Sequence, residues 1–151
     1  GRSVRELMED HWQRFGRTFY SRHDYEALPV APAEAVMAGL RQSLSGLPGT
    51  VVGDTSVTLA DDFAYHDPVD GSESRSQGLR VVFANGARFV LRLSGTGTEG
   101  ATLRLYLEQH SDSPADFARD PQEALSAVIA AADQLAKITS LTGRPAADVV
   151  T

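Results

Sequence analysis

The sequence predicts an α+β fold, in which helices pack on one face of an antiparallel sheet. Apolar residues recur at helical spacing near both ends of the chain, whereas the middle alternates apolar and polar residues with the period of two that is typical of strands. The strand candidates follow one another through turns, so we expect them to form a meander. The length of 151 residues is enough for a single domain, residues 1–151, with its own core.

The first predicted helix begins after Ser3 and ends at Gly16. Ser3 and Glu6 have the spacing of a capping box, in which two side chains satisfy two free N–H groups at the start of a helix. The apolar and aromatic stripe of this helix consists of Val4, Leu7, Met8, His11, Trp12 and Phe15. Residues 17–26 mix aromatic and charged side chains without a clear period, so no element is predicted there.

A second helix is predicted around Pro32, a residue that suits the first turn of a helix. Its apolar face consists of Val36, Met37, Leu40 and Leu44, and it ends before Gly46, Pro48 and Gly49.

The middle of the chain is predicted to form strands, with candidates at residues 51–60, 63–65, 79–83, 87–93 and 101–110. Residues 67–78 are expected to form a loop with a turn at Asp70 and Gly71. The pair Asn85 and Gly86 lies between two apolar segments, which is the strongest short-range signal for a hairpin.

The end of the chain is predicted to be one helix. Asp120 is the expected cap, Pro121 takes the first helical position and Glu123 has the spacing of a capping box. A single apolar stripe contains Leu125, Val128, Ile129, Ala132, Leu135, Ala136 and Thr139. Gly143 is expected to end the helix, and Pro145 follows it.

Residues 94–100 are expected to form a glycine-rich loop between two strands. Gly95, Gly97 and Gly100 match the dinucleotide-binding spacing G-x-G-x-x-G, but that motif requires a helix directly after the loop. The residues that follow alternate with a period of two, which predicts a strand, so we reject the dinucleotide interpretation. A helix at residues 101–110 would restore it. A Walker loop is excluded as well, because no Lys-Ser/Thr pair follows the glycines.

The same loop is a candidate anion site. Its backbone N–H groups and hydroxyls can turn toward one point. Alternation places Arg92 and Arg104 on the same face of the two flanking strands, and two guanidinium groups match a phosphate dianion. The alternative is an ordinary hairpin loop with two surface arginines, and Glu99 adds a negative charge that favours it.

Composition limits the classes of partner. The formal net charge of −6 argues against a nucleic-acid partner, and no apolar run approaches the length of a membrane span. The absence of cysteine excludes thiolate chemistry and is compatible with a reducing cytoplasm. No metal site is predicted. His11, His23, His66 and His110 have no metal-binding spacing, and the acidic residues Asp61, Asp62, Asp67 and Asp70 lack the calcium-loop pattern.

Four segments resemble one family. RLSGTGTEGATLRLYLE resembles the phosphate loop in domain 4 of the phosphoglucomutase branch of the α-D-phosphohexomutase superfamily. DHWQRFGRTFYSRHDYE, FAYHDPVDGSESRSQGLR and TGRPAADVVT are similar to the same family, in the same order along the chain. The resemblance covers nearly the whole chain, and it implies a C-terminal domain with a TATA-binding-protein-like α+β fold.

The resemblance also implies residue roles. The family positions that hold the non-reacting phosphate of the substrate correspond to Arg92, Ser94, Gly95, Thr96 and Arg104. Thr98 and Glu99 depart from the small residues that are common in the family; they alter the charge of the loop and leave the phosphate-holding positions intact. The implied parent enzyme interconverts glucose 1-phosphate and glucose 6-phosphate in the cytoplasm, through a phosphoserine and a bisphosphate intermediate.

The catalytic serine and the ligands of Mg²⁺ belong to upstream domains in this family. The isolated chain is therefore expected to hold no catalytic residue and to be inactive, with hexose phosphate and the upstream domains as its partners. Aromatic residues near the start are expected in the core or against those domains: Trp12, Phe15, Phe19, Tyr20 and Tyr25. Arg17, Arg22 and Arg75 either line the substrate cleft or form salt bridges.

Two rival functions remain open from sequence alone. A member of the family can keep the fold as a non-catalytic binding or scaffold module, and the upstream sequence would decide by showing or lacking the serine loop. Nucleic-acid binding is suggested only by fold analogy, and the acidic charge disfavours it.

Overall fold

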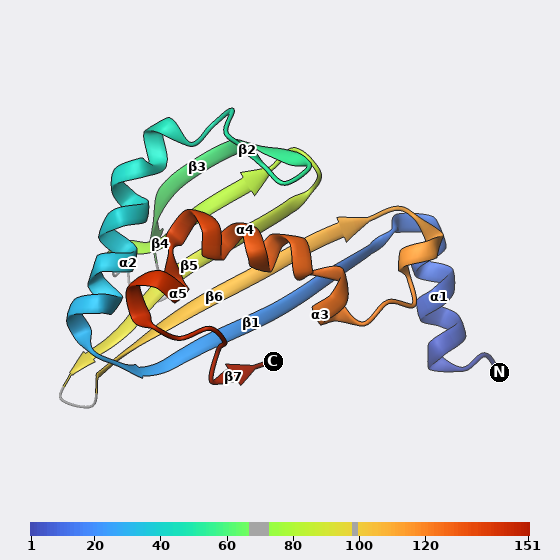
Figure 1. Ribbon diagram of the computed structural model, residues 1–151. Helices are drawn as coiled ribbons and strands as arrows, with labels where there is room; N and C mark the ends of the chain where they lie inside the picture. Colours follow the sequence, from blue (N-terminus) through green and yellow to red (C-terminus); the bar gives the residue numbers. More distant parts are fainter. Residues whose placement is uncertain (67–72, 98–99) are drawn as a thin grey trace.

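The computed structural model describes residues 1–66, 73–97 and 100–151. Within them, seven strands form one antiparallel sheet in the order β2-β3-β4-β5-β6-β1-β7 (Figure 1). The strands are β1 (Arg17–Leu28), β2 (Val51–Val52), β3 (Thr55–His66), β4 (Glu73–Phe83), β5 (Ala87–Gly97), β6 (Gly100–Ser111) and β7 (Val149–Val150). The α-helices are α1 (Val4–Phe15), α2 (Val30–Ser43), α3 (Pro121–Ala124), α4 (Ser126–Ala136) and α5 (Ile138–Thr142). Two 3₁₀ turns are η1 (Leu44–Gly46) and η2 (Pro114–Asp116).

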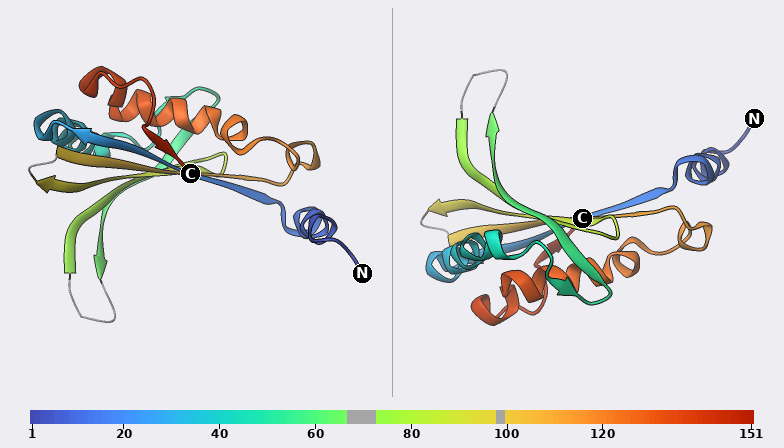
Figure 2. Two further views of the ribbon diagram at one scale, coloured as in Figure 1. Left: turned by 90° about the horizontal axis from the view of Figure 1, so that it is seen from below. Right: turned by 90° about the horizontal axis from the view of Figure 1, so that it is seen from above.

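Helices α2, α4 and α5 cover one face of the sheet, and the ends of β3 and β4 curve away from this layer (Figure 2). The core lies between the helices and the central strands. Its largest fully buried side chains include Leu79, Phe89, Leu91, Leu103, Leu105 and Leu107. The predicted α+β class, with helices on one face of an antiparallel sheet, is confirmed. Among the described helices, none combines the length and the apolar character needed to cross a membrane.

The first two helices form as their sequences predict. The Ser3 hydroxyl accepts the Glu6 N–H at 3.2 Å, and the Glu6 carboxylate accepts the Ser3 N–H at 2.8 Å, which completes the capping box. Helix α2 buries the predicted face at Val36, Met37 and Leu40.

Strand β1 was not predicted, because two polar side chains occupy positions on its core-facing side. Ser21 and His23 are only 7 % exposed. The amide of Gln122 on α3 satisfies both: its nitrogen donates to the Ser21 hydroxyl at 2.8 Å, and its oxygen lies 2.9 Å from His23 Nε2. These hydrogen bonds allow a strand whose apolar alternation is interrupted.

Two predictions in the β-rich region were wrong in their boundaries. A turn at Gly53, with φ of +61°, separates β2 from β3, and β3 then continues without a break to His66. The predicted loop at 67–78 is shorter, since β4 begins at Glu73 and pairs with the end of β3. Pairing with a neighbouring strand overrides the low strand propensity of this polar segment. Residues 67–72, with the predicted turn at Asp70 and Gly71, lie outside the described residues.

The predicted single helix at the end of the chain is divided into three. Asp120 caps α3 as expected, through the N–H groups of Gln122 and Glu123 at 3.0 and 3.2 Å. Lys137 adopts a left-handed conformation, with φ of 58°, and separates α4 from α5. The Asp133 carboxylate accepts the Thr139 N–H at 2.8 Å and so satisfies a free donor at the break.

Candidate anion-binding site

Most of the segment that was expected to be a loop belongs to the β5–β6 hairpin. Both strands extend into the segment 94–100, and the register runs from Ser94 opposite Thr102 to Gly97 opposite Gly100. Strand β5 therefore has one residue more than β6 between these two pairs, which is a β-bulge at residues 95–96. Only residues 98–99 separate the strands, and they lie outside the described residues.

Two glycines shape this hairpin for different reasons. Gly95 has φ of +62°, and a Cβ atom there would meet no atom within 4 Å, so its backbone conformation alone favours glycine. Gly100 has φ of +92°, and a Cβ atom there would lie 2.7 Å from the Leu28 carbonyl oxygen. Glycine at this position therefore lets β6 begin directly against the end of β1.

Arg92 and Arg104 lie directly opposite each other in the β5–β6 register. Their neighbours Leu91, Leu103 and Leu105 are buried in the core. Because side chains alternate along a strand, both arginines point to the sheet face that the helices leave open. The predicted placement of the two arginines on one face is therefore correct, and Ser94 shares this face.

A third strand places a carboxylate beside the two arginines, so that Arg92, Arg104 and Asp24 form a row across three strands. Asp24 on β1 is the register partner of Arg104, and its side chain is only 5 % exposed. Its Oδ1 atom lies 3.0 Å from Nε of Arg22, which is two residues earlier on the same face. Sequence reasoning missed Asp24, because β1 itself was not predicted. Arg22 forms an ion pair here, one of the two roles expected for it.

Three buried side-chain polar atoms in the described part of the chain lack a hydrogen-bond partner, and all three lie in this row or beside it. They are Nε of Arg22, Oδ1 of Asp24 and Nε of Arg104. The first two form an ion pair at 3.0 Å but not a hydrogen bond. Buried donors are rarely left unpaired, and Nε of Arg104 is one that the described residues do not satisfy.

The other predicted residues are placed as follows. Gly95 lies in the bulge, where backbone N–H groups of an irregular strand can turn toward an anion. The side chains of Thr96 and Arg75 lie outside the described part. Arg17 packs over the Trp12 and Phe19 rings, with its Cζ atom 4.4 and 4.3 Å from their centroids, which is the packing of a structural residue.

The open face continues into a cleft of about 390 Å³ next to this row, with Arg22, Arg88, Tyr106 and Glu108 in its lining. Most of the other charges on this face are paired. Arg88 Nε lies 2.5 Å from Glu108, and two hydrogen bonds of 2.9 and 2.6 Å join Arg80 to Asp61. The hydrogen bonds to Asp61 raise the pKa of Arg80 above its usual value.

Residues 100–111 form a strand, so the dinucleotide interpretation fails on the condition set by the sequence. Within the described ranges, no three His, Asp or Glu side chains gather closely enough to hold a metal ion.

Fold and geometry together define a class: a curved antiparallel α+β domain with an arginine-lined candidate anion site where two strands meet in a bulged hairpin. Comparison with known proteins narrows the class. Residues 17–148 match the family model described as the C-terminal domain of phosphoglucomutase-1. The chain is 48 % identical to a phosphoglucomutase of Rhizobium radiobacter and 41 % identical to phosphoglucomutase-1 of Oryctolagus cuniculus, in each case over 99 % of this chain and 28 % of the relative.

A solved structure supports the same family. The open form of the Paramecium phosphoprotein pp63/parafusin, a phosphoglucomutase, superposes with a TM-score of 0.82 at 37 % identity, covering 99 % of this chain and 25 % of that one. The chain therefore belongs to the phosphoglucomutase family and corresponds to its C-terminal domain. It spans little more than a quarter of the length of these relatives.

Proposed function

We propose that this domain binds a hexose phosphate through the phosphate group that does not react. It does so as the C-terminal part of a phosphoglucomutase. The proposed ligands are Arg92, Ser94, Gly95, Thr96 and Arg104. The observation that carries the proposal is the pair formed by Arg92 and Arg104, opposite each other on the open face, with Nε of Arg104 buried and without a partner.

Physical chemistry favours a phosphate as the acceptor. A guanidinium group offers N–H donors in a planar fork that fits phosphate oxygens, and charged hydrogen bonds of this kind are about twice as strong as neutral ones. The whole chain carries a formal charge of −6, so a local group of arginines is needed to attract an anion against the overall field. Three arginines and one carboxylate, residues 22, 24, 92 and 104, supply a local excess of positive charge.

The parent protein is proposed to interconvert glucose 1-phosphate and glucose 6-phosphate. In that reaction an enzyme phosphoserine donates its phosphate to the substrate. The bisphosphate intermediate then returns a phosphate to the serine. We assign the serine and the Mg²⁺ that supports this transfer to the preceding domains, which this chain does not include. Its own residues hold the distal phosphate and thereby orient the sugar, a positioning role that accelerates a reaction without forming a bond.

The isolated chain is accordingly proposed to bind phosphate and to have no mutase activity. Its proposed partners are the hexose phosphate and the preceding domains, and its proposed location is the cytoplasm, since relatives from Populus tremula and Pisum sativum are cytoplasmic phosphoglucomutases.

An amide NMR titration of this chain with glucose 1-phosphate and with inorganic phosphate tests the proposal. We expect shifts at residues 94–97 and near Arg104, with a Kd in the millimolar range, because a single isolated phosphate site supplies about 4 kcal/mol. Arg104→Ala should abolish the shifts. Arg88→Ala is the matched control, since Arg88 is on the same strand face as Arg92 but is paired with Glu108. Equal binding by both variants, or no shifts in the unmodified chain, would contradict the proposal.

A further inference from the structure

Helix α1 exposes most of its apolar stripe. Its side chains include Val4, Leu7, Met8 and Phe15, which are 74, 52, 46 and 64 % exposed. No residue of this helix is buried. Large exposed apolar side chains number ten in the described residues, and four of them are on this one helix. A concentration of this kind marks a surface that another body covers.

Four charged residues of α1, Arg5, Glu6, Glu9 and Asp10, have partners in the helix or just before it. Arg5 lies 3.0 Å from Glu9, and Arg2 lies 3.6 Å from Asp10. These charges therefore do not require an external partner, and the apolar stripe is what remains to be covered. A helix of 12 residues is also marginal in water when it lacks tertiary packing, even with a capping box.

In the described residues, the ring contacts that join α1 to the rest of the domain lie in its C-terminal half. The Trp12 ring lies 6.2 Å from the Phe117 ring, and Arg17 stacks on Trp12. At Gly16 the backbone is closely surrounded, since a Cβ atom there would lie 2.6 Å from Asp112 Oδ1.

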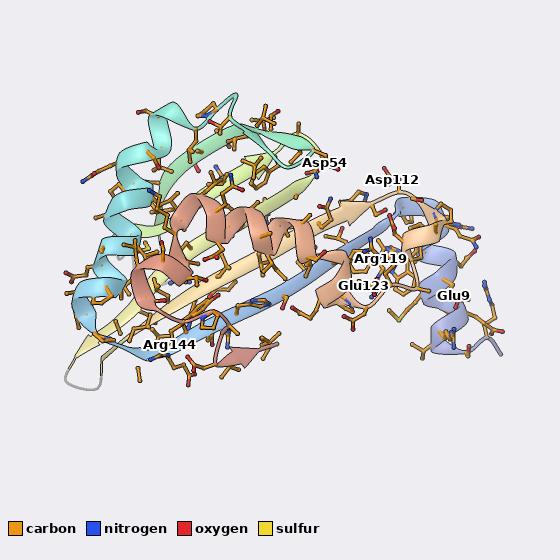
Figure 3. All side chains as sticks on the ribbon, viewed as in Figure 1. Glu9, Asp54, Asp112, Arg119, Glu123 and Arg144 are labelled. Atoms are coloured by element: carbon orange, nitrogen blue, oxygen red, sulfur yellow. The ribbon has the colours of Figure 1, made fainter. Side chains whose placement is uncertain are left out.

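The remainder of α1 projects beyond the end of the sheet, away from α2, α4 and α5 (Figures 1 and 2). Glu9 lies on this projecting helix, and Arg119 lies nearer the sheet, in the segment that leads to α3 (Figure 3).

The match to the family model begins at the same place. The family model of the C-terminal domain begins at residue 17, directly after α1, whereas relatives match 99 % of the chain and so include this helix. More than two thirds of each relative lies outside the match, and for a C-terminal domain that part precedes residue 1.

We propose that α1 is structurally a part of the preceding domain of the parent protein, and that its stripe of Val4, Leu7, Met8 and Phe15 packs into that domain. The boundary between the two domains then lies at Gly16 and Arg17, so the C-terminal domain is residues 17–151 rather than the whole chain. This inference rests on the family membership and the exposed stripe, and it does not depend on the phosphate site.

The test compares one pair of variants in two settings. Leu7→Glu places a charge on the stripe, and Gln13→Glu places the same charge on the opposite side of α1. Both are made in this chain and in the full-length parent, and thermal unfolding is measured. In the parent we expect Leu7→Glu to lower the midpoint by several degrees and Gln13→Glu to leave it unchanged. In this chain neither substitution should matter, because Leu7 is already in water.

Hydrogen exchange of the unmodified proteins gives a second measurement that does not require a variant to fold. Amides of residues 8–15 should exchange at least tenfold more slowly in the parent than in this chain. Equal exchange in both, or a parent that tolerates Leu7→Glu as well as Gln13→Glu, would overturn the proposal. So would a chain that forms dimers in sedimentation and loses them on Leu7→Glu, since a second copy would then be what covers the stripe. Loss of phosphate binding by Arg104→Ala is independent of all these results.

Discussion

Replacing Gly100 with alanine tests how β6 begins against the end of β1. The added Cβ atom would lie 2.7 Å from the Leu28 carbonyl oxygen and 3.2 Å from the Ala27 carbonyl carbon, and neither backbone atom can rotate away. The φ of +92° is in addition a conformation that residues with a side chain rarely adopt. The substitution must therefore move the end of β1, where Leu28 pairs with Ala101.

The expected cost has two parts. A positive φ costs a residue with a side chain about 1–2 kcal/mol. Overlap with fixed backbone adds about 1–3 kcal/mol, by analogy with overpacked cores. The total is about 2–5 kcal/mol, which is a large share of the stability of a typical domain, about 5–15 kcal/mol.

Urea denaturation followed by circular dichroism measures this cost. With a slope of about 2 kcal/mol per molar urea, Gly100→Ala should lower the midpoint by about 1–2.5 M. Gly95→Ala is the matched control, because Gly95 also has a positive φ but has open space where its Cβ atom would lie. Its cost should be confined to the backbone part. If the two variants had equal midpoints, the close approach of Gly100 to β1 would not exist and the argument would be refuted.

Two further predictions concern groups on β1. Burial, followed by the negative charges of Asp133 and Asp148, raises the pKa of Tyr25, so the folded state retains this proton at a pH where the unfolded chain releases it. Stability should therefore fall as pH rises above about 10, the usual tyrosine pKa, and Tyr25→Phe should remove this part of the dependence in denaturation curves. Asp24→Asn should lower the free energy of unfolding by about 1–2 kcal/mol in urea denaturation. This is less than the ~3–5 kcal/mol for breaking a fully buried pair, because the side chain of its partner Arg22 is 40 % exposed. Unchanged stability would show that the ion pair contributes nothing.

Local signals account for most of the elements that the sequence predicted correctly. Capping by Ser3 and Asp120, the turn at Asn85 and Gly86, and the alternation along β6 each depend on residues close together in the chain. Such patterns can be recognised without knowledge of the fold, and they sufficed for the fold class.

The errors arose where distant residues determine local structure. Strand β1 depends on Gln122, about a hundred positions away, to satisfy polar side chains on its core face. The break at Lys137 depends on Asp133 capping the next helix, which a continuous apolar stripe conceals.

The same distinction applies to the candidate site. Arg92 and Arg104 are joined by a short hairpin, so alternation alone placed them together. Asp24 reaches the row only through the pairing of β1 with β6, which the sequence does not reveal. The one available signal was the segment similar to the family, SRHDYE, which contains both Arg22 and Asp24.

Steady-state kinetics of the full-length parent test the central claim most directly. Glucose 1-phosphate is the substrate, and Arg104→Ala is compared with Arg88→Ala in the same protein. Loss of one charged hydrogen bond to the bound phosphate, about 1.5–3 kcal/mol, should lower kcat/KM by about 10- to 150-fold for Arg104→Ala. Arg88→Ala should leave kcat/KM within a factor of about two, since a surface ion pair contributes little. Equal kcat/KM values for the two variants would contradict the claim that this domain holds the substrate's phosphate through Arg104.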